Sequence, residues 1–160
     1  MKTIKHQTQP TWDSCVATCI AMIIGKPATD VDKEFTEGYM SGDILTKDYL
    51  KKEGFVAVQL PSKEVIQWGK LYMLIVPSLT KRGHLHAVLF DTRNEDKDGD
   101  YYEVLLDPNK GKEGKLYYDL HKLPDGEWLK GGEFIPLTGD LGVQLCSYVP
   151  NYEIKEEDNV

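Results

Sequence analysis

The chain of 160 residues lacks several features that would point to common classes of protein. It has no apolar run near the roughly 18 residues of a membrane helix, and the segment from Met1 to Pro10 lacks the apolar middle of a signal peptide. The net charge is −7 and the lysines are scattered, which argues against binding to nucleic acid. Three cysteines make an odd number, so we do not expect a disulfide framework. These absences predict a cytoplasmic protein without a membrane or nucleic-acid partner.

The residues that are present suit one folded domain. Hydrophobic residues make up 41% of the chain, which is enough for a core, and no linker or repeat divides the sequence. We expect a single domain over residues 1–152. The segment EIKEEDNV at 153–160 is charged and is expected to be a frayed tail.

The clearest element is a helix from Cys15 to Ile24, CVATCIAMII, in which Thr18 is the only polar residue. A helix that is apolar on every side is a buried helix. Asp13 or Ser14 is a suitable cap for its start, and Gly25 for its end. Further elements follow from the apolar patterns. Helices are expected at 29–39, 43–54 and 62–68, and strands at 55–60, 71–76, 85–90, 101–106 and 143–149, with a charged hairpin loop at 91–100. Helices followed by an antiparallel sheet predict an α+β fold, with the cysteine helix packed on the sheet.

Cys15 is the candidate nucleophile. The thiolate form of cysteine attacks carbonyl carbon atoms, and the positive end of a helix favours that form. Cys15 stands in the first turn of the predicted helix, whereas Cys19 lies one turn deeper. The alternative is that Cys15 is a small buried hydrophobic residue, as free cysteines often are.

A nucleophile needs a base, and His86 is the best candidate among the four histidines. His84 and His86 point to one face of a predicted strand, but His86 lies deeper in the apolar run and His84 stands beside a turn. Asp107 ends the strand that pairs with the His86 strand, where its carboxylate is placed to fix the imidazole tautomer. Asp91 is the weaker candidate for this role because it lies at the far end of the strand. The sequence Asp-Pro-Asn is also ordinary turn chemistry.

Gln9 precedes Cys15 by six residues. Its amide is placed to reach over the helix start and donate to an oxyanion, together with the backbone N–H of Cys15. Gln7 is the competing candidate, with a less suitable spacing. The alternative is that Gln9 is a surface residue of a polar N-terminal arm.

The segment QPTWDSCVATCIAM at 9–22 resembles the nucleophile region of papain-like cysteine peptidases, closest to the bacteriocin-processing peptidase domains and their stand-alone relatives. The later segments His-Ala-Val-Leu and Leu-Asp-Pro resemble that family's histidine and aspartate segments, in the same chain order. The resemblance implies a papain-like fold and a cysteine peptidase or amidase that needs no cofactor or metal and acts on a peptide or protein substrate. It assigns Cys15 as nucleophile, His86 as base, Asp107 as orienting acid and Gln9 as oxyanion donor. The family usually has Gly where this chain has Val16, and the removal of leader peptides at a transporter is not carried over.

Other functions remain open. The same residues suit an acyltransferase or a transglutaminase-like enzyme, and a papain-like domain can also serve only for binding. Cys15 and Cys19 with His84 and His86 are a possible zinc set. The acidic residues at 96, 98 and 100 suggest a calcium loop only weakly, because their spacing is not that of an EF-hand.

Overall fold

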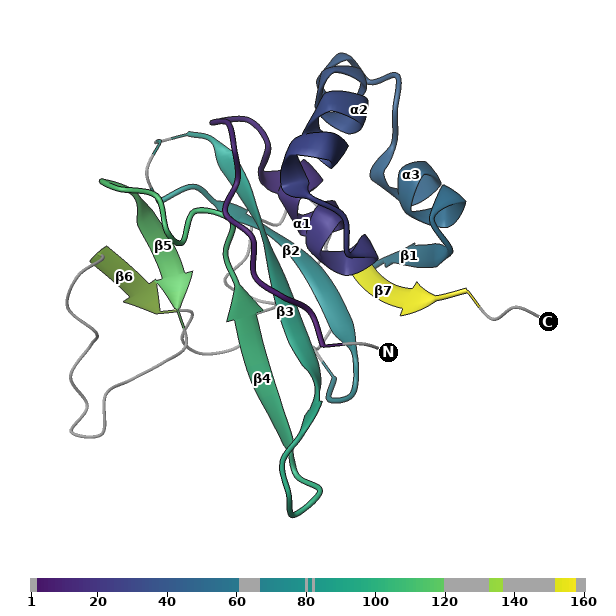
Figure 1. Ribbon diagram of the computed structural model, residues 1–160. Helices are drawn as coiled ribbons and strands as arrows, with labels where there is room; N and C mark the ends of the chain where they lie inside the picture. Colours follow the sequence, from purple (N-terminus) through teal and green to yellow (C-terminus); the bar gives the residue numbers. More distant parts are fainter. Residues whose placement is uncertain are drawn as a thin grey trace.

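The computed structural model describes residues 3–60, 67–79, 81, 83–119, 133–136 and 152–157. Within these residues the chain forms an α+β fold, in which three helices precede the strands (Figure 1). The elements are α1 Cys15–Ile24, α2 Ala28–Ser41, α3 Thr46–Lys52, β1 Phe55–Gln59, β2 Leu71–Pro77, β3 Leu85–Glu95, β4 Tyr101–Leu106, β5 Leu116–Asp119, β6 Glu133–Pro136 and β7 Tyr152–Glu156.

Helix α1 has the bounds that the sequence predicts and is buried from Val16 to Ile23. It ends at Gly25, whose φ of 74° lies in the left-handed region that favours glycine, and whose N–H donates to the carbonyl of Ala21 at 2.9 Å. Thr18 is satisfied within the helix because its hydroxyl donates to the carbonyl of Ser14 at 2.7 Å. The single polar residue of the buried helix therefore leaves no unpaired group in the core.

The predicted side-chain cap at the start of α1 is wrong. Ser14 occupies the cap position, but its hydroxyl turns back to Thr11, accepting from the N–H and donating to the carbonyl at 3.0 Å each. Asp13 accepts from the hydroxyl of Thr11 instead. Because the side chain of Ser14 does not bond to them, the backbone N–H groups of the first turn of α1 remain hydrogen-bond donors beside Cys15.

The main sheet has the strand order β1-β7-β2-β3-β4, and every neighbouring pair is antiparallel, as predicted. β2 is the central strand and is buried from Leu71 to Val76, in agreement with its continuous apolar sequence. Odd-numbered residues of β2 pack in the core that includes α1, and even-numbered residues pack in a second core with Tyr118. The cysteine helix therefore covers one face of the sheet, and β5 lies toward the other (Figure 1).

The tail prediction is wrong for residues 153–156. They belong to β7, which pairs with β1 on one side and β2 on the other. Ile154 is only 2% exposed, whereas Lys155 and Glu156 are exposed. The charged residues hid an alternating strand pattern, because every second side chain of the strand faces outward.

The other element boundaries shift by a few residues. β3 continues to Glu95, so much of the predicted hairpin loop is strand. Asp91 is held there by both side-chain bonds from Arg93, and Thr92 bonds to the backbone of Lys70. The predicted strand 143–149 lies outside the described residues, as does 62–66 of the predicted helix 62–68; the described residues 67 and 68 are not helical.

Candidate active site

Cys15 lies at the start of α1, partly exposed, on the wall of a cavity of about 380 Å³. Residues of the N-terminal arm, of α1 and of the turn between β2 and β3 line this cavity. His86 and Gln9 line the same cavity. The structure therefore brings three of the predicted residues, which come from separate segments, around one space of the size that binds small ligands.

His86 is the second residue of β3 and is buried. Its Nε2 atom lies 2.6 Å from Oδ1 of Asp107, and the thiol of Cys15 is close enough to interact electrostatically with the ring. Since Asp107 occupies Nε2, the nitrogen left for Cys15 is Nδ1. Burial alone lowers the pKa of His86, but the hydrogen bond to Asp107, the interaction with Cys15 and the charges of both groups outweigh it and raise the pKa to about 9. At neutral pH the ring is therefore an imidazolium between a carboxylate and a thiol group.

Asp107 follows β4 directly and is 1% exposed. Oδ1 accepts from the N–H of Asn109 at 2.8 Å as well as from His86, and Oδ2 accepts from the N–H of Tyr118 at 2.7 Å. Both oxygens are thus held by groups from three separate segments. A carboxylate fixed in this way orients the imidazole without moving itself.

Gln9 is 4% exposed and is not the surface residue of the alternative interpretation. Its Nε2 donates to the carbonyls of Thr11 at 2.8 Å and Trp12 at 3.3 Å, and its buried Oε1 has no hydrogen-bond partner among the described residues. The amide therefore lies beside the cavity of Cys15, but its donor hydrogens are engaged with the backbone. The longer bond to Trp12 is the weaker of the two.

Gln7 has a structural contact instead. Its amide donates to the carbonyl of Lys26 at 2.8 Å and accepts from the N–H of Ala28 at 2.7 Å. These bonds attach the N-terminal arm to the turn between α1 and α2, away from the cavity.

The arm also holds the turn that carries Asp107, a contact that sequence analysis missed. His6 donates to the carbonyl of Asp107 at 2.7 Å, and the hydroxyl of Thr8 donates to the carbonyl of Lys110 at 2.7 Å. The N–H of Gln9 donates to the carbonyl of Pro108 at 2.8 Å. His6 and Thr8 thus face the Asp107 turn while Gln7 between them faces the helices. The alternating sequence His-Gln-Thr-Gln at residues 6–9 was the signal from which these contacts could have been predicted.

Three of the four residues of the zinc alternative line the cavity, namely Cys15, His84 and His86, but they are not arranged to hold a metal ion. Cys19 is completely buried, and burial, then the charges of Cys15 and Asp107, raise the pKa of its thiol well above its ordinary value. His84 is exposed at the cavity wall, and His86 is engaged by Asp107. Over the described ranges, no group of three or more His, Cys, Asp or Glu side chains is arranged to hold a metal ion.

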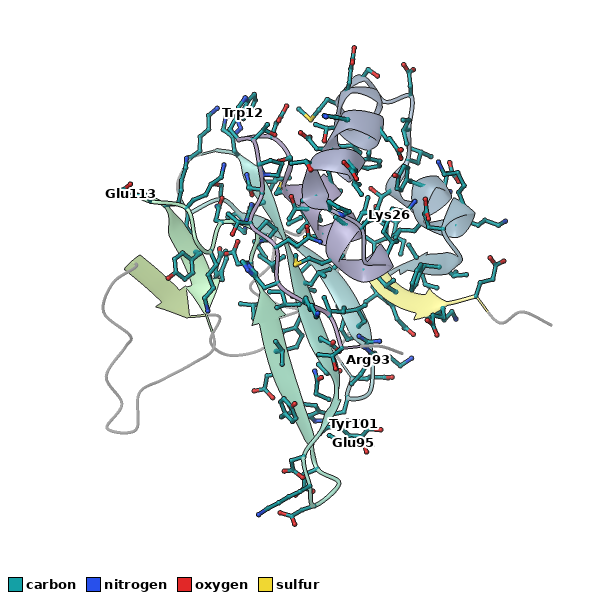
Figure 2. The ribbon with its side chains drawn as sticks, in the orientation of Figure 1. Trp12, Lys26, Arg93, Glu95, Tyr101 and Glu113 are labelled. Carbon is teal, nitrogen blue, oxygen red and sulfur yellow. The ribbon has the colours of Figure 1, made fainter. Side chains whose placement is uncertain are left out.

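The acidic residues at 96, 98 and 100 form a hairpin tip. Asp96 Oδ1 accepts from the N–H groups of Asp98 at 2.8 Å and Asp100 at 3.0 Å, so it closes a tight turn. Asp91, the weaker candidate for the orienting acid, pairs with Arg93 in the part of β3 beyond His86. Figure 2 shows Arg93 well below Trp12, which belongs to the segment that leads into α1.

Comparisons with protein-family models, with curated proteins and with solved structures gave no match. In the part of the chain that the structure describes, none of the helices has the length and apolar character needed to cross a membrane.

Proposed function

We propose that this chain is a cysteine hydrolase of papain-like fold, which cleaves a peptide or amide bond through a thioester on Cys15. The observation that carries the proposal is the placement of His86, buried between the carboxylate of Asp107 and the thiol of Cys15 beside an open cavity. The resemblance of the cysteine, histidine and aspartate segments to papain-like peptidases supports it independently.

The first half of the reaction forms the thioester. The Cys15 thiolate attacks the substrate carbonyl carbon, so that an S–C bond forms and the carbonyl oxygen becomes an oxyanion. When the oxyanion collapses, the C–N bond breaks and the His86 imidazolium gives its proton to the leaving amine. The uncapped N–H groups at the start of α1 are the available donors to the oxyanion, and the amide of Gln9 joins them only if it leaves the carbonyl of Thr11 or Trp12.

The second half restores the enzyme. Neutral His86 takes a proton from water, and the resulting hydroxide attacks the thioester carbonyl. The C–S bond then breaks, the carboxylic acid leaves, and Cys15 and His86 return to the thiolate–imidazolium pair. An amine in place of water gives acyl transfer, so the acyltransferase and transglutaminase-like alternatives use the same residues and differ only in the acceptor.

A non-catalytic binding domain is the second candidate. The observation that favours it is the engagement of Gln9, whose amide hydrogens point to the carbonyls of Thr11 and Trp12. Val16, which lines the cavity where the family usually has glycine, adds bulk near Cys15. Such a domain keeps the cavity but needs no reactive thiolate.

The experiment that separates the two candidates is whole-protein mass spectrometry after a brief treatment at pH 6 with limiting iodoacetamide. A hydrolase is expected to take one label, mapped to Cys15 by peptide analysis, because His86 stabilises the thiolate. Cys15→Ala is the control for site assignment and His86→Ala is the control for mechanism. Equal labelling of Cys15, Cys19 and Cys146 contradicts the proposed function.

A further inference from the structure

Three basic side chains line the Cys15 cavity. Lys81 and His84 come from the turn between β2 and β3, and Lys115 directly precedes β5. The chain as a whole carries a net charge of −7, so this local excess of cationic groups runs against its composition. A cavity lined with one sign of charge raises the local concentration of ligands of the opposite sign.

Hydrogen bonds of the backbone hold the two segments that carry Lys81 and Lys115. Ser78 donates its N–H to the carbonyl of His84 at 2.8 Å, and its hydroxyl accepts from the N–H of Lys81 at 3.1 Å. Lys115 enters β5 three residues before Tyr118, whose N–H is bound by the carboxylate of Asp107. The turn that presents Lys81 and the strand that follows Lys115 are thus attached to the same framework as His86 and Asp107.

Neither lysine is neutralised by an acid among the described residues. The ammonium group of Lys81 lies 4.7 Å from the ring centroid of Trp12, a contact that keeps its charge. Asp13 is the only carboxylate among the described residues that line the cavity, and it accepts from the hydroxyl of Thr11. No described carboxylate forms a salt bridge with Lys81 or Lys115.

The width of the cavity sets the scale over which these charges act. A sphere of about 380 Å³ is about 9 Å across, close to the Debye length of about 8 Å at physiological ionic strength. Trp12, Met40 and Leu85 line the cavity and are exposed, with Trp12 66% exposed. The site therefore offers cationic groups beside apolar surface for the methylene groups of a side chain.

We propose that the substrates are acidic peptides, in which a Glu or Asp carboxylate lies within about one residue of the carbonyl that Cys15 attacks. This inference rests on the proposed function. Lys81 and Lys115 are specificity-determining residues in it: they attract the carboxylate and take no part in the transfer of protons or in the bonds that form and break.

The test uses two alkylating reagents of similar size, anionic iodoacetate and neutral iodoacetamide. In each reaction the Cys15 thiolate displaces iodide and forms a thioether. The measured quantity is the ratio of the two rates at Cys15, in wild type, Lys115→Gln and the double variant Lys81→Gln/Lys115→Gln. Lys97→Gln, at the hairpin tip, is the matched control because it removes one positive charge far from the cavity.

We expect the rate ratio of iodoacetate to iodoacetamide to fall about fivefold in the double variant at low ionic strength, because two charges about 9 Å away in water give this factor. Added salt is expected to reduce the difference. Lys115→Gln is expected to give about half of the effect on a logarithmic scale, and Lys97→Gln to leave the ratio unchanged. Thermal unfolding of each variant separates a charge effect from a loss of fold.

A second measurement addresses substrates directly. The para-nitrophenyl esters of N-acetylglutamine and N-acetylglutamate have nearly the same size and differ in charge. We expect wild type to prefer the glutamate ester in kcat/KM and the double variant to lose that preference. The kcat/KM for the glutamine ester is expected to stay within about twofold, because the lysines do not touch the reacting bonds.

The outcomes distinguish the inference from the proposed function. If iodoacetamide labels Cys15 selectively but the reagent ratio and ester preference are the same in the double variant, the acidic-peptide inference is wrong and the hydrolase remains. If neither reagent selects Cys15 and neither ester is turned over, the proposed function itself is wrong.

Discussion

The two ends of strand β4 carry the same local turn chemistry and have opposite surroundings. Before the strand, Asp96 Oδ1 accepts from the N–H two residues later at 2.8 Å. After the strand, Asp107 Oδ1 accepts from the N–H of Asn109, also two residues later and also at 2.8 Å. Asp96 lies in an exposed tip, whereas Asp107 is 1% exposed. Figure 2 shows Glu95 and Tyr101, which flank the tip, far from Trp12 at the cavity.

The difference arises from what other segments bring to each turn. Among the described residues, Asp96 has only its own turn as a partner, with donors from Asp98 and Asp100. Asp107 also receives His86 from β3 and the N–H of Tyr118 from β5, while His6 binds its carbonyl. A buried carboxylate is tolerated only with such partners. Turn chemistry and a bond to His86 are therefore compatible at one residue, and the catalytic role of Asp107 stays a prediction.

The largest expected difference between the two ends is in stability. Asp107→Ala leaves the His86 imidazolium and two buried N–H groups without their acceptor, and we expect it to lower the free energy of unfolding by about 3–5 kcal/mol. Asp96→Ala is expected to cost about 0.5 kcal/mol, because its turn is exposed to water. Urea denaturation of both variants measures the contrast.

Asp107→Asn keeps the comparison testable if Asp107→Ala does not fold. The amide oxygen can still accept from the imidazole, but the negative charge is lost, so we expect a smaller loss of stability and an intermediate loss of alkylation rate. Equal costs for Asp96→Ala and Asp107→Asn would mean that the contacts of Asp107 contribute nothing beyond the turn.

We expect the stability to depend on pH through the buried end of β4, where Asp107 binds His86, and not through the exposed end at Asp96. The folded-state pKa of His86 is raised to about 9 from an ordinary value of 6.5. Its contribution is therefore fully present below about pH 6.5 and is lost as the pH rises through about 9. We expect the difference in unfolding free energy between wild type and His86→Ala to shrink by up to about 3 kcal/mol over this window. Asp96→Ala, the control, is expected to keep the wild-type profile; a flat difference for His86→Ala contradicts the imidazolium.

The two histidines beside the cavity are expected to differ in their effect on Cys15. His86→Ala removes the partner of the thiolate, and we expect the rate of alkylation at pH 6 to fall about 100-fold. His84→Ala removes an exposed side chain with no bond to Asp107 and is expected to change the rate by less than about threefold. A larger effect of His84→Ala would place the reactive pair at His84, two residues earlier in the chain and just before β3.

The structural features that could be predicted from the sequence are those whose sequence signals lie within a short stretch of the chain. The helix at Cys15 and the central strand β2 were predicted because their apolar patterns lie within a few residues of sequence. β7 was missed because its position between β1 and β2 depends on strands far away in sequence, and its charges obscured Ile154. The bond between His86 and Asp107 was predicted, because the two strands beside which they lie were expected to pair. The orientation of the Gln9 amide was not, since it depends on two backbone carbonyls.

The smallest expected effect concerns the N-terminal arm. Of the two ends of β4, the described contacts of the arm are with the Asp107 end. His6→Ala removes one partly buried hydrogen bond to the carbonyl of Asp107, and we expect a cost of about 1 kcal/mol and an alkylation rate at Cys15 reduced about twofold. Gln7→Ala is the matched control, because the neighbouring side chain binds Lys26 and Ala28 instead. It is expected to cost similar stability and leave the alkylation rate unchanged. If both variants slow alkylation equally, the arm acts through its general attachment to the domain, and His6 has no separate part in positioning Asp107.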